Sequence, residues 1–285
     1  MWQSISVFGL KLGISRNLLW RVAVGIIAIP AIIYISLHHT LILSVFTALL
    51  SLLGAFELTR LMNGLRTGLI KLILPIASAG LMLSISSGWL MPAVSVFFAA
   101  IAIVTIVSSF TNNTTVLKEA VTETVFGLFY CGILFSSIPL IAFHEPDGGK
   151  WLVALLIIIW SSDTAAYFGG KATGKKKLAH HISPGKTIAG LWWGFAGAVL
   201  ASLILGLTWI PRIELPFLLP LSIVLSGIGV VGDLFESALK RDAAVKDSSS
   251  IIPGHGGILD RFDSILFAAP TLYIFLLLRE SLNRH

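Results

Sequence analysis

Four polar residues in the C-terminal half of the chain have a spacing that could build a catalytic surface. Asp233, Glu236, Ser237 and Lys240 recur at intervals of three or four residues, which places them on one face of a helix. Carboxylate oxygens bind hard cations such as Mg²⁺, and the ammonium group of a lysine can neutralise a phosphate. This face therefore predicts a site for a divalent metal ion and a phosphorylated substrate.

A second acidic face follows the loop 240–257. Asp260, Asp263 and Ser264 share one side at the start of another predicted helix. The loop ends in a run of proline, glycine and histidine at 253–257, whose exposed N–H groups, together with the positive end of the helix, favour phosphate. The two faces and the loop together predict an oxygen-rich pocket that is suited to Mg²⁺.

These acids also have a purely structural interpretation, in which they only pair with the nearby basic residues Lys240, Arg241, Lys246 and Arg261. We favour the functional interpretation, because a structural cluster does not need so many carboxylates at the edge of an apolar segment. His255 stays open between a general base and a residue that orients its neighbours by hydrogen bonding.

A second polar loop spans residues 170–187. It follows an apolar run that carries Asp163 near its end, and it contains Lys175 and further lysines. We expect the segment 183–187 to turn into a helix and to hold phosphate through Ser183, Lys186 and Thr187. The alternative is a basic loop that only stops translocation of the chain.

The elements that position these residues are membrane spans. Hydrophobic residues make up 56% of the 285 residues and charged residues 12%, with a mean hydropathy of +0.92. A water-soluble domain does not support this composition. A bilayer core about 30 Å thick needs about 20 apolar residues per helical crossing, with every backbone polar group satisfied within its segment. The sequence therefore predicts an all-α, polytopic integral membrane protein with about nine transmembrane helices, at 20–38, 41–59, 69–87, 90–110, 124–143, 151–169, 188–209, 215–239 and 258–279.

Basic residues are distributed unevenly between the predicted loops. With the N-terminus in the cytoplasm, most of the 20 lysines and arginines fall on the cytoplasmic side, which is the positive-inside pattern. We therefore expect a multi-pass protein of the cell inner (cytoplasmic) membrane with its active site facing the cytoplasm. This distribution accounts for the net charge of +6, so we expect no binding of nucleic acid.

The two halves of the chain differ in their acids, although no linker divides them. Residues 1–150 are expected to form about five transmembrane helices as a scaffold that could also dimerise. Residues 151–285 are expected to form the catalytic region, with cytoplasmic loops at 170–187 and 240–257, within a single integrated domain. Because charge within a bilayer is costly, carboxylates in or at the ends of spans are functional candidates, and these are Glu57, Asp163, Asp233, Glu236, Asp260 and Asp263.

The run from Ser237 to Asp263 also resembles a family signature. It reads S-x-L-K-R-x4-K-D-x-S-x2-I-P-x-H-G-G-I-x-D-R-F-D, and it is similar to the signature of bacterial phosphatidate cytidylyltransferases, also called CDP-diacylglycerol synthases. The stretch from Asp163 to Thr187 resembles the upstream block of the same family. Ala189 departs from it, since relatives often carry an acidic or amide residue there.

The resemblance implies a reaction of CTP with phosphatidic acid that yields CDP-diacylglycerol and pyrophosphate, in phospholipid biosynthesis and with Mg²⁺. It further implies a homodimer, metal ligation by Asp233 and Asp260, and a K⁺ ion beside the Mg²⁺.

Spacing and resemblance together suggest a role for each candidate residue. The expected metal ligands are Asp233, Glu236, Asp260 and Asp263, and the expected catalytic residues are Asp233, Asp260, Lys240 and Asp263. The expected substrate-binding residues are Asp163, Lys175, Ser183, Lys186, Thr187, Ser237, Arg241, Lys246, Asp247, His255, Gly256, Gly257 and Arg261.

Two other functions stay open. Another CTP-dependent membrane enzyme, such as a polyprenol or phytol kinase, would transfer the γ-phosphoryl group and release CDP instead of pyrophosphate. A cation-coupled transporter would need carboxylates at the bilayer midplane and interrupted helices in both halves. The acids of this chain instead gather at one edge of one half, which argues against transport.

Overall fold

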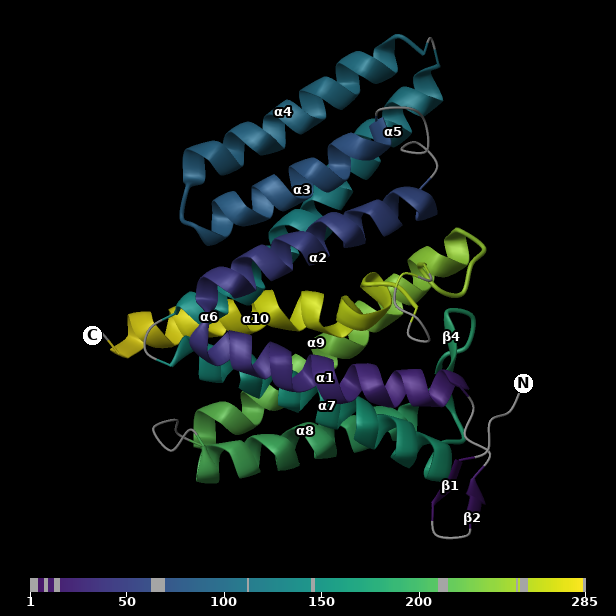
Figure 1. The fold of residues 1–285 in the computed structure, drawn as a ribbon, viewed down its shortest axis with the longest axis vertical. Coiled ribbons are helices and arrows are strands. Elements are labelled where there is room, and N and C mark those ends of the chain that lie inside the picture. The colour runs from purple at the N-terminus through teal and green to yellow at the C-terminus, as the bar shows by residue number, and fades with distance from the viewer. Residues whose placement is uncertain are drawn as a thin grey trace.

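The computed structural model describes residues 5–7, 10–12, 16–62, 70–111, 113–144, 147–209, 215–249, 251 and 256–283. Within these ranges the chain forms nine helical rods and two short antiparallel hairpins (Figure 1). The helices are α1 (Arg16–His38), α2 (Thr40–Leu61), α3 (Ile70–Ser86), α4 (Leu90–Ser109), α5 (Thr114–Gly127), the π-helix η1 (Leu128–Ile133), α6 (Leu134–Phe143), α7 (Gly148–Thr173), α8 (Ile188–Thr208), α9 (Leu215–Asp242) and α10 (Leu259–Asn283). The hairpins pair β1 (Ile5–Val7) with β2 (Leu10–Leu12), and β3 (Lys177–Ala179) with β4 (Ser183–Thr187).

Seven rods of the described chain are long and apolar enough to cross a bilayer. They are α2, α4, the continuous rod from α5 through α6, α7, α8, α9 and α10. Within α1 and α3, the shorter apolar helices Ile26–His38 and Lys71–Ser86 occupy two further predicted positions. The predicted all-α, polytopic architecture is confirmed.

The rod that contains α5 is longer than the sequence predicts. The predicted span 124–143 continues an earlier helix that begins at Thr114, where the side chain of Asn113 accepts hydrogen bonds from the N–H groups of Thr115 and Val116. This cap stabilises a polar first turn that hydropathy alone does not detect. Further along, the rod widens into η1, and there the carbonyl of Cys131 accepts a hydrogen bond from Ser51 Oγ at 2.6 Å.

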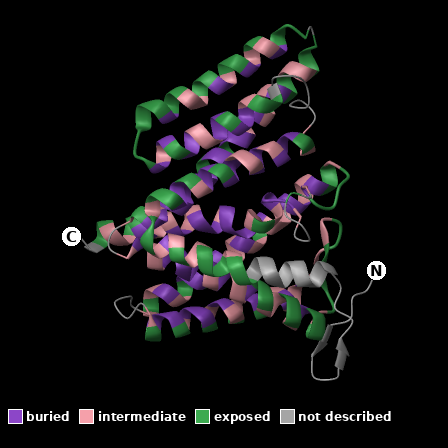
Figure 2. Cartoon of the chain, viewed as in Figure 1, coloured by how far each residue is buried: buried purple, intermediate pink, exposed green. Residues whose placement is uncertain are grey.

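Apolar side chains both fill the interior and cover the outside of the molecule. Leu58, Phe135 and Leu155 are completely buried, whereas Phe98 of α4 is 64% exposed and Leu90 is 72% exposed. Exposed and buried residues alternate along most rods (Figure 2). So much exposed apolar surface is unfavourable in water but suits helices that contact lipid.

Glycines bring together the helices that carry the polar loops. A Cβ at Gly197 of α8 would lie 2.6 Å from Ala165 Cβ of α7, and one at Gly232 of α9 would lie 2.9 Å from Phe267 Cδ2 of α10. Small residues at such positions let helix backbones approach closely in a membrane. These close approaches pack α7 against α8 and α9 against α10.

Candidate functional site

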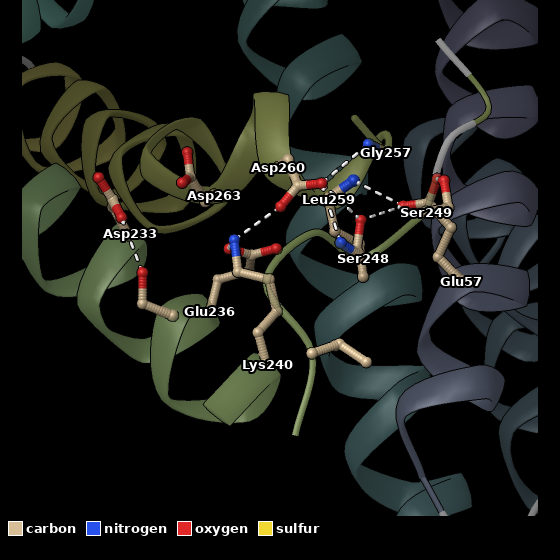
Figure 3. Close-up of polar contacts among 12 residues, drawn as sticks. Glu57, Asp233, Glu236, Lys240, Ser248, Ser249, Gly257, Leu259, Asp260 and Asp263 are labelled. Atoms are coloured by element: carbon tan, nitrogen blue, oxygen red, sulfur yellow. Dashed lines mark hydrogen bonds and ion pairs between the residues drawn. The ribbon is translucent and has the colours of Figure 1, made fainter. Parts of the chain in front are cut away.

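Polar side chains from five elements gather near the end of α2, the C-terminal halves of α7 and α9, and the start of α10. These elements contribute Glu57 (α2), Asp163 (α7), Lys186 (β4), Asp233 (α9) and Asp260 (α10). Ion pairs and hydrogen bonds join β4 to α9, α9 to α10, and α2 to the loop before α10. In Figure 3, Asp233 and Glu57 lie at opposite sides of the group, with Asp260 between them.

Lys240 is the centre of the first group of charges. Its ammonium pairs with Glu236, one turn earlier on α9, and donates a hydrogen bond to Asp260 Oδ1 of α10 at 2.6 Å. The Lys240 side chain is 11% exposed and that of Glu236 is fully buried, so water screens these interactions only weakly. Lys240 therefore ties α9 to α10 and neutralises part of the charge of both acids.

The second carboxylate oxygen of Asp260 is held by three donors. Oδ2 accepts hydrogen bonds from Ser248 N–H at 3.0 Å, Ser248 Oγ at 3.0 Å and Gly257 N–H at 2.8 Å. Gly256 has φ +83°, and a Cβ there would lie 2.8 Å from the same oxygen, so the turn requires glycine. Both oxygens of Asp260 are thus engaged, and the carboxylate joins Ser248 to Gly257 just before α10.

Glu57 holds the other side of that loop. Its side chain is completely buried. Oε1 accepts from Ser249 Oγ at 2.5 Å and Ile258 N–H at 2.8 Å, while Oε2 accepts from Ser248 Oγ at 2.9 Å and Leu259 N–H at 3.0 Å. The negative charge of Glu57 therefore lies at the positive end of α10. The sequence marks Glu57 as a costly carboxylate within a span, but its spacing gives no sign of these partners.

These contacts overturn one expectation. The sequence predicts that the N–H groups at the start of α10 bind phosphate. In the structure Gly257 N–H donates to Asp260, and Ile258 and Leu259 donate to Glu57. The prediction is wrong for these three groups, because buried carboxylates of the protein itself need donors and take them. His255, a predicted substrate-binding residue, lies outside the described residues.

Asp233 belongs to a second group of charges. Its Oδ2 pairs with Lys186 Nζ at 2.6 Å, and its Oδ1 accepts from Ser237 Oγ at 3.3 Å. Asp163 and Asp263 are near enough to interact electrostatically with both Asp233 and Lys186. Lys186 therefore contacts one carboxylate and feels the charge of two more. The Asp233 side chain is 30% exposed. An accessible site with an excess of negative charge attracts cations.

The four predicted metal ligands divide between the two groups. Glu236 and Asp260 contact Lys240, whereas Asp233 contacts Lys186 and has Asp263 nearby. In the described part of the chain, no three acidic, histidine or cysteine side chains form a group that could hold a metal ion. Mg²⁺ usually takes one or two protein carboxylates and completes its octahedron with water and substrate phosphates. Asp233 and Asp263 fit that pattern.

The segment 183–187 differs from its predicted form. It does lead into a helix, as predicted, but it first forms β4 of a hairpin. Thr187 is the N-cap of α8 and accepts a hydrogen bond from Gly190 N–H at 3.0 Å, so its buried hydroxyl already has a structural role. Lys186 reaches Asp233, and Ser183 lies half-buried at the start of the strand.

The remaining predicted substrate-binding residues lie around the two groups. Arg241 donates to the carbonyl of Val245 at 3.0 Å, which closes the end of α9. Lys175 follows α7, Lys246 and Asp247 follow α9, and Arg261 lies in the first turn of α10. All four of these residues are exposed. These positions do not test the predicted roles in substrate binding, which stay predictions.

The sequence is similar to those of known enzymes. The sequence model of the cytidylyltransferase family matches residues 19–279. A phosphatidate cytidylyltransferase of Staphylococcus epidermidis (strain ATCC 35984) is 37% identical over 265 residues, which cover 90% of this chain and 98% of that protein. One of Bacillus subtilis (strain 168) is 45% identical over 153 residues, and one of Brucella suis biovar 1 is 42% identical over 152 residues.

The Bacillus and Brucella alignments each cover 52% of this chain and 55% of the relative, so there the chain spans about half the length of the protein it matches. The family match, in contrast, runs from α1 into α10 and includes every residue of both charge groups. The chain belongs to the cytidylyltransferase family.

Proposed function

We propose that the chain transfers the cytidylyl group of CTP to phosphatidic acid, giving CDP-diacylglycerol and pyrophosphate. One observation carries the proposal: the part of the chain that matches the cytidylyltransferase family brings lysines and carboxylates together at the ends of helices that can span a membrane. Relatives that carry the name phosphatidate cytidylyltransferase support the choice of substrates.

The proposed reaction asks the protein chiefly to position and neutralise phosphates. A phosphate oxygen of phosphatidic acid forms a bond to the α-phosphorus of CTP, the bond from that phosphorus to the oxygen that bridges to the β-phosphorus breaks, and pyrophosphate leaves. Both reactants are anions, so alignment and positive charge lower the barrier. Lys186, whose side chain is 25% exposed, would neutralise the phosphates of CTP.

Mg²⁺ would be held by Asp233 and Asp263, with Asp163 beside them. When bound, the ion neutralises phosphate oxygens and stabilises the charge that develops on the leaving group. Glu236 and Asp260 contact Lys240. Direct ligation of a metal by Asp260 therefore rests on the sequence resemblance, as does a neighbouring K⁺ ion, and ligation by Glu236 rests on the spacing of its helix face. In this arrangement Lys240 keeps the second acidic face in place beside the first.

We further propose that the protein lies in the cell inner membrane, that the site faces the cytoplasm, and that the chain acts as a homodimer. The basic residues of the loops support the orientation. The acyl chains of phosphatidic acid stay in lipid, while its headgroup reaches the helix ends from the side.

Product analysis tests the proposal. Purified protein in lipid nanodiscs, supplied with CTP, phosphatidic acid and Mg²⁺, should release one pyrophosphate for each lipid-linked cytidine nucleotide, and nothing without phosphatidic acid. Release of CDP with a phosphorylated lipid would instead identify a CTP-dependent lipid kinase. If neither product forms with folded protein, the proposal fails.

A further inference from the structure

Glu57 is the feature of the site that neither the predicted roles nor the family match explains. It lies at the end of α2, in the half of the chain expected to be scaffold, yet its partners Ser248, Ser249, Ile258 and Leu259 belong to the catalytic half. Its side chain has no exposed surface. Burying an ionised carboxylate is costly unless several donors surround it, so four donors on one carboxylate indicate a built site.

Each oxygen of Glu57 receives one serine hydroxyl and one backbone N–H. Oε1 binds Ser249 Oγ and Ile258 N–H, and Oε2 binds Ser248 Oγ and Leu259 N–H. The side chain thereby fastens the loop and caps α10 at the same time. It connects the loop residues 248–249 to the first residues of the helix that carries Asp260 and Asp263.

Ser248 extends this connection to the charged centre. Its Oγ lies 2.9 Å from Glu57 Oε2 and 3.0 Å from Asp260 Oδ2. Because a serine hydroxyl has one proton, the two carboxylates share it: it is either the fourth donor of Glu57 or the third donor of Asp260, and it couples the positions of both. Asp260 in turn binds Lys240, which pairs with Glu236. A continuous chain of contacts thus runs from α2 to α9.

Glycines allow the close packing that this chain of contacts needs. A Cβ at Gly257 would lie 2.7 Å from Glu57 Cδ, and one at Gly54, a turn before Glu57 on α2, would lie 3.1 Å from Leu259 Cδ2. Larger residues at either position would push α2 away from the start of α10.

We infer that Glu57 is a positioning residue that holds Ser248, Ser249 and the N-terminus of α10, and through Ser248 the carboxylate of Asp260, in the arrangement used for cytidylyl transfer. The inference rests on the proposed function for the reaction that is served. The geometric part, that Glu57 immobilises the loop, stands on the contacts alone.

Glutamine at position 57 is a sharp test, because it keeps size and shape but removes one acceptor. Whichever way the amide is turned, its NH₂ group faces either Ile258 N–H or Leu259 N–H, since each oxygen of Glu57 accepts one of them. Serine hydroxyls can rotate to adapt, but a backbone N–H cannot. Loss of an outer partner of a metal-site residue typically lowers activity about 10- to 100-fold.

The experiment combines turnover with a measurement that needs no substrate. Cys131 is the one cysteine of the sequence and is buried, so a Cys131→Ala background carries a nitroxide label on Ile251→Cys, where the native side chain is 39% exposed. Glu57→Gln should make the label spectrum more mobile and lower kcat about 10- to 100-fold. The matched control is Ser51→Ala, which also removes a buried hydrogen-bonding group from α2 and should leave label mobility unchanged.

Folded Glu57→Gln protein with unchanged label mobility would overturn the inference, as would unchanged kcat. If this variant does not fold, Ser248→Ala in the same labelled background makes the test, because it cuts the link between Glu57 and Asp260. For Ser248→Ala we expect a more mobile label and a lower kcat. An unchanged label mobility or an unchanged kcat would contradict the inference. A wild-type protein that transfers nothing from CTP would refute the proposed function instead, and label mobility would still decide whether Glu57 holds the loop.

Discussion

At the scale of single residues, the site depends on how a few lysines are shared among many carboxylates. Lys240 serves Glu236 and Asp260, and Lys186 serves Asp233 with Asp163 and Asp263 nearby. Each group keeps more acidic than basic side chains, which suits a site that must accept a cation together with anionic phosphates. Loss of one lysine should therefore disturb several acids at once.

Lys240→Met should be strongly destabilising. Removal of one partner from a buried ion pair leaves the other charges uncompensated, which costs about 3–5 kcal/mol. The free energy of unfolding in mixed detergent micelles measures the effect. Lys150→Met is the matched control, because Lys150 pairs with Asp147 at 2.8 Å but is 41% exposed, and exposed pairs contribute about 0–1 kcal/mol. Equal losses in the two variants would contradict a buried role for Lys240.

Asp233→Asn should weaken binding of a divalent cation even in the absence of substrate. Titration of the purified protein with Mn²⁺, followed by the electron paramagnetic resonance of the free ion, measures this directly. Because Asp233 is proposed as a direct ligand, the loss should exceed the about 10- to 100-fold effect of outer partners. Asp147→Asn serves as the control, because Asp147 is the N-cap residue of α7 and belongs to neither charge group. This variant should bind Mn²⁺ like wild type. Unaltered binding by Asp233→Asn would remove that residue from the metal site.

At the scale of elements, close helix packing sets the distance between the two acidic faces. Gly232 immediately precedes Asp233 and faces α10, where Asp263 begins the turn that ends at Phe267. The hairpin of β3 and β4 brings Lys186 to the same place from the end of α7. No element carries the chemistry alone, since α9 and α10 each supply acids to both charge groups and β4 supplies Lys186.

Gly232→Ala should separate these faces. The added Cβ would lie 2.9 Å from Phe267 Cδ2 and closer still to the carbonyl of Asp263, so the helices must shift, at about 1–3 kcal/mol for an overpacked contact. Thermal unfolding and turnover should both fall. Gly80→Ala is the control, since its Cβ would meet nothing nearer than Val96 Cγ1 at 3.8 Å. Wild-type behaviour of Gly232→Ala would show that this approach is not needed.

Much of the element scale could be predicted, because its signals are local. The length of each apolar run predicts a membrane span, and intervals of three and four residues between polar side chains predict the helix face that carries Asp233 and Lys240. The partners of Glu57 could not be predicted, since Ser248 lies 191 positions away and their contact exists only after the helices pack. The sequence predicts phosphate at the start of α10 for the same reason: it shows which donors exist, but not which acceptor reaches them.

At the scale of the whole molecule, an alternating path through the membrane explains why distant acids meet. With nine crossings and a cytoplasmic N-terminus, α2, α7 and α9 all end on the cytoplasmic side, where α10 begins. Glu57 lies near the end of α2 and Asp260 at the start of α10, while Asp163 and Asp233 lie in the C-terminal halves of α7 and α9. Contacts between them are thus what the expected topology requires.

Reporter fusions test that orientation. A fusion after Gly174, which follows α7, should score as cytoplasmic, and one after Asp147, which precedes α7, should score as periplasmic. The two positions flank one helix and so control for each other. A periplasmic score after Gly174 would invert the scheme and place the site on the wrong side for CTP.

The fate of the α-phosphorus of CTP separates cytidylyl transfer from phosphoryl transfer. Purified wild-type protein in nanodiscs is incubated with phosphatidic acid, Mg²⁺ and CTP labelled at the α-phosphorus or, in a parallel sample, at the γ-phosphorus. Cytidylyl transfer predicts that label enters the lipid only from the α-position, and that Asp233→Asn abolishes this transfer. Label that enters the lipid from the γ-position, or no labelled lipid with folded wild-type protein, would contradict the account.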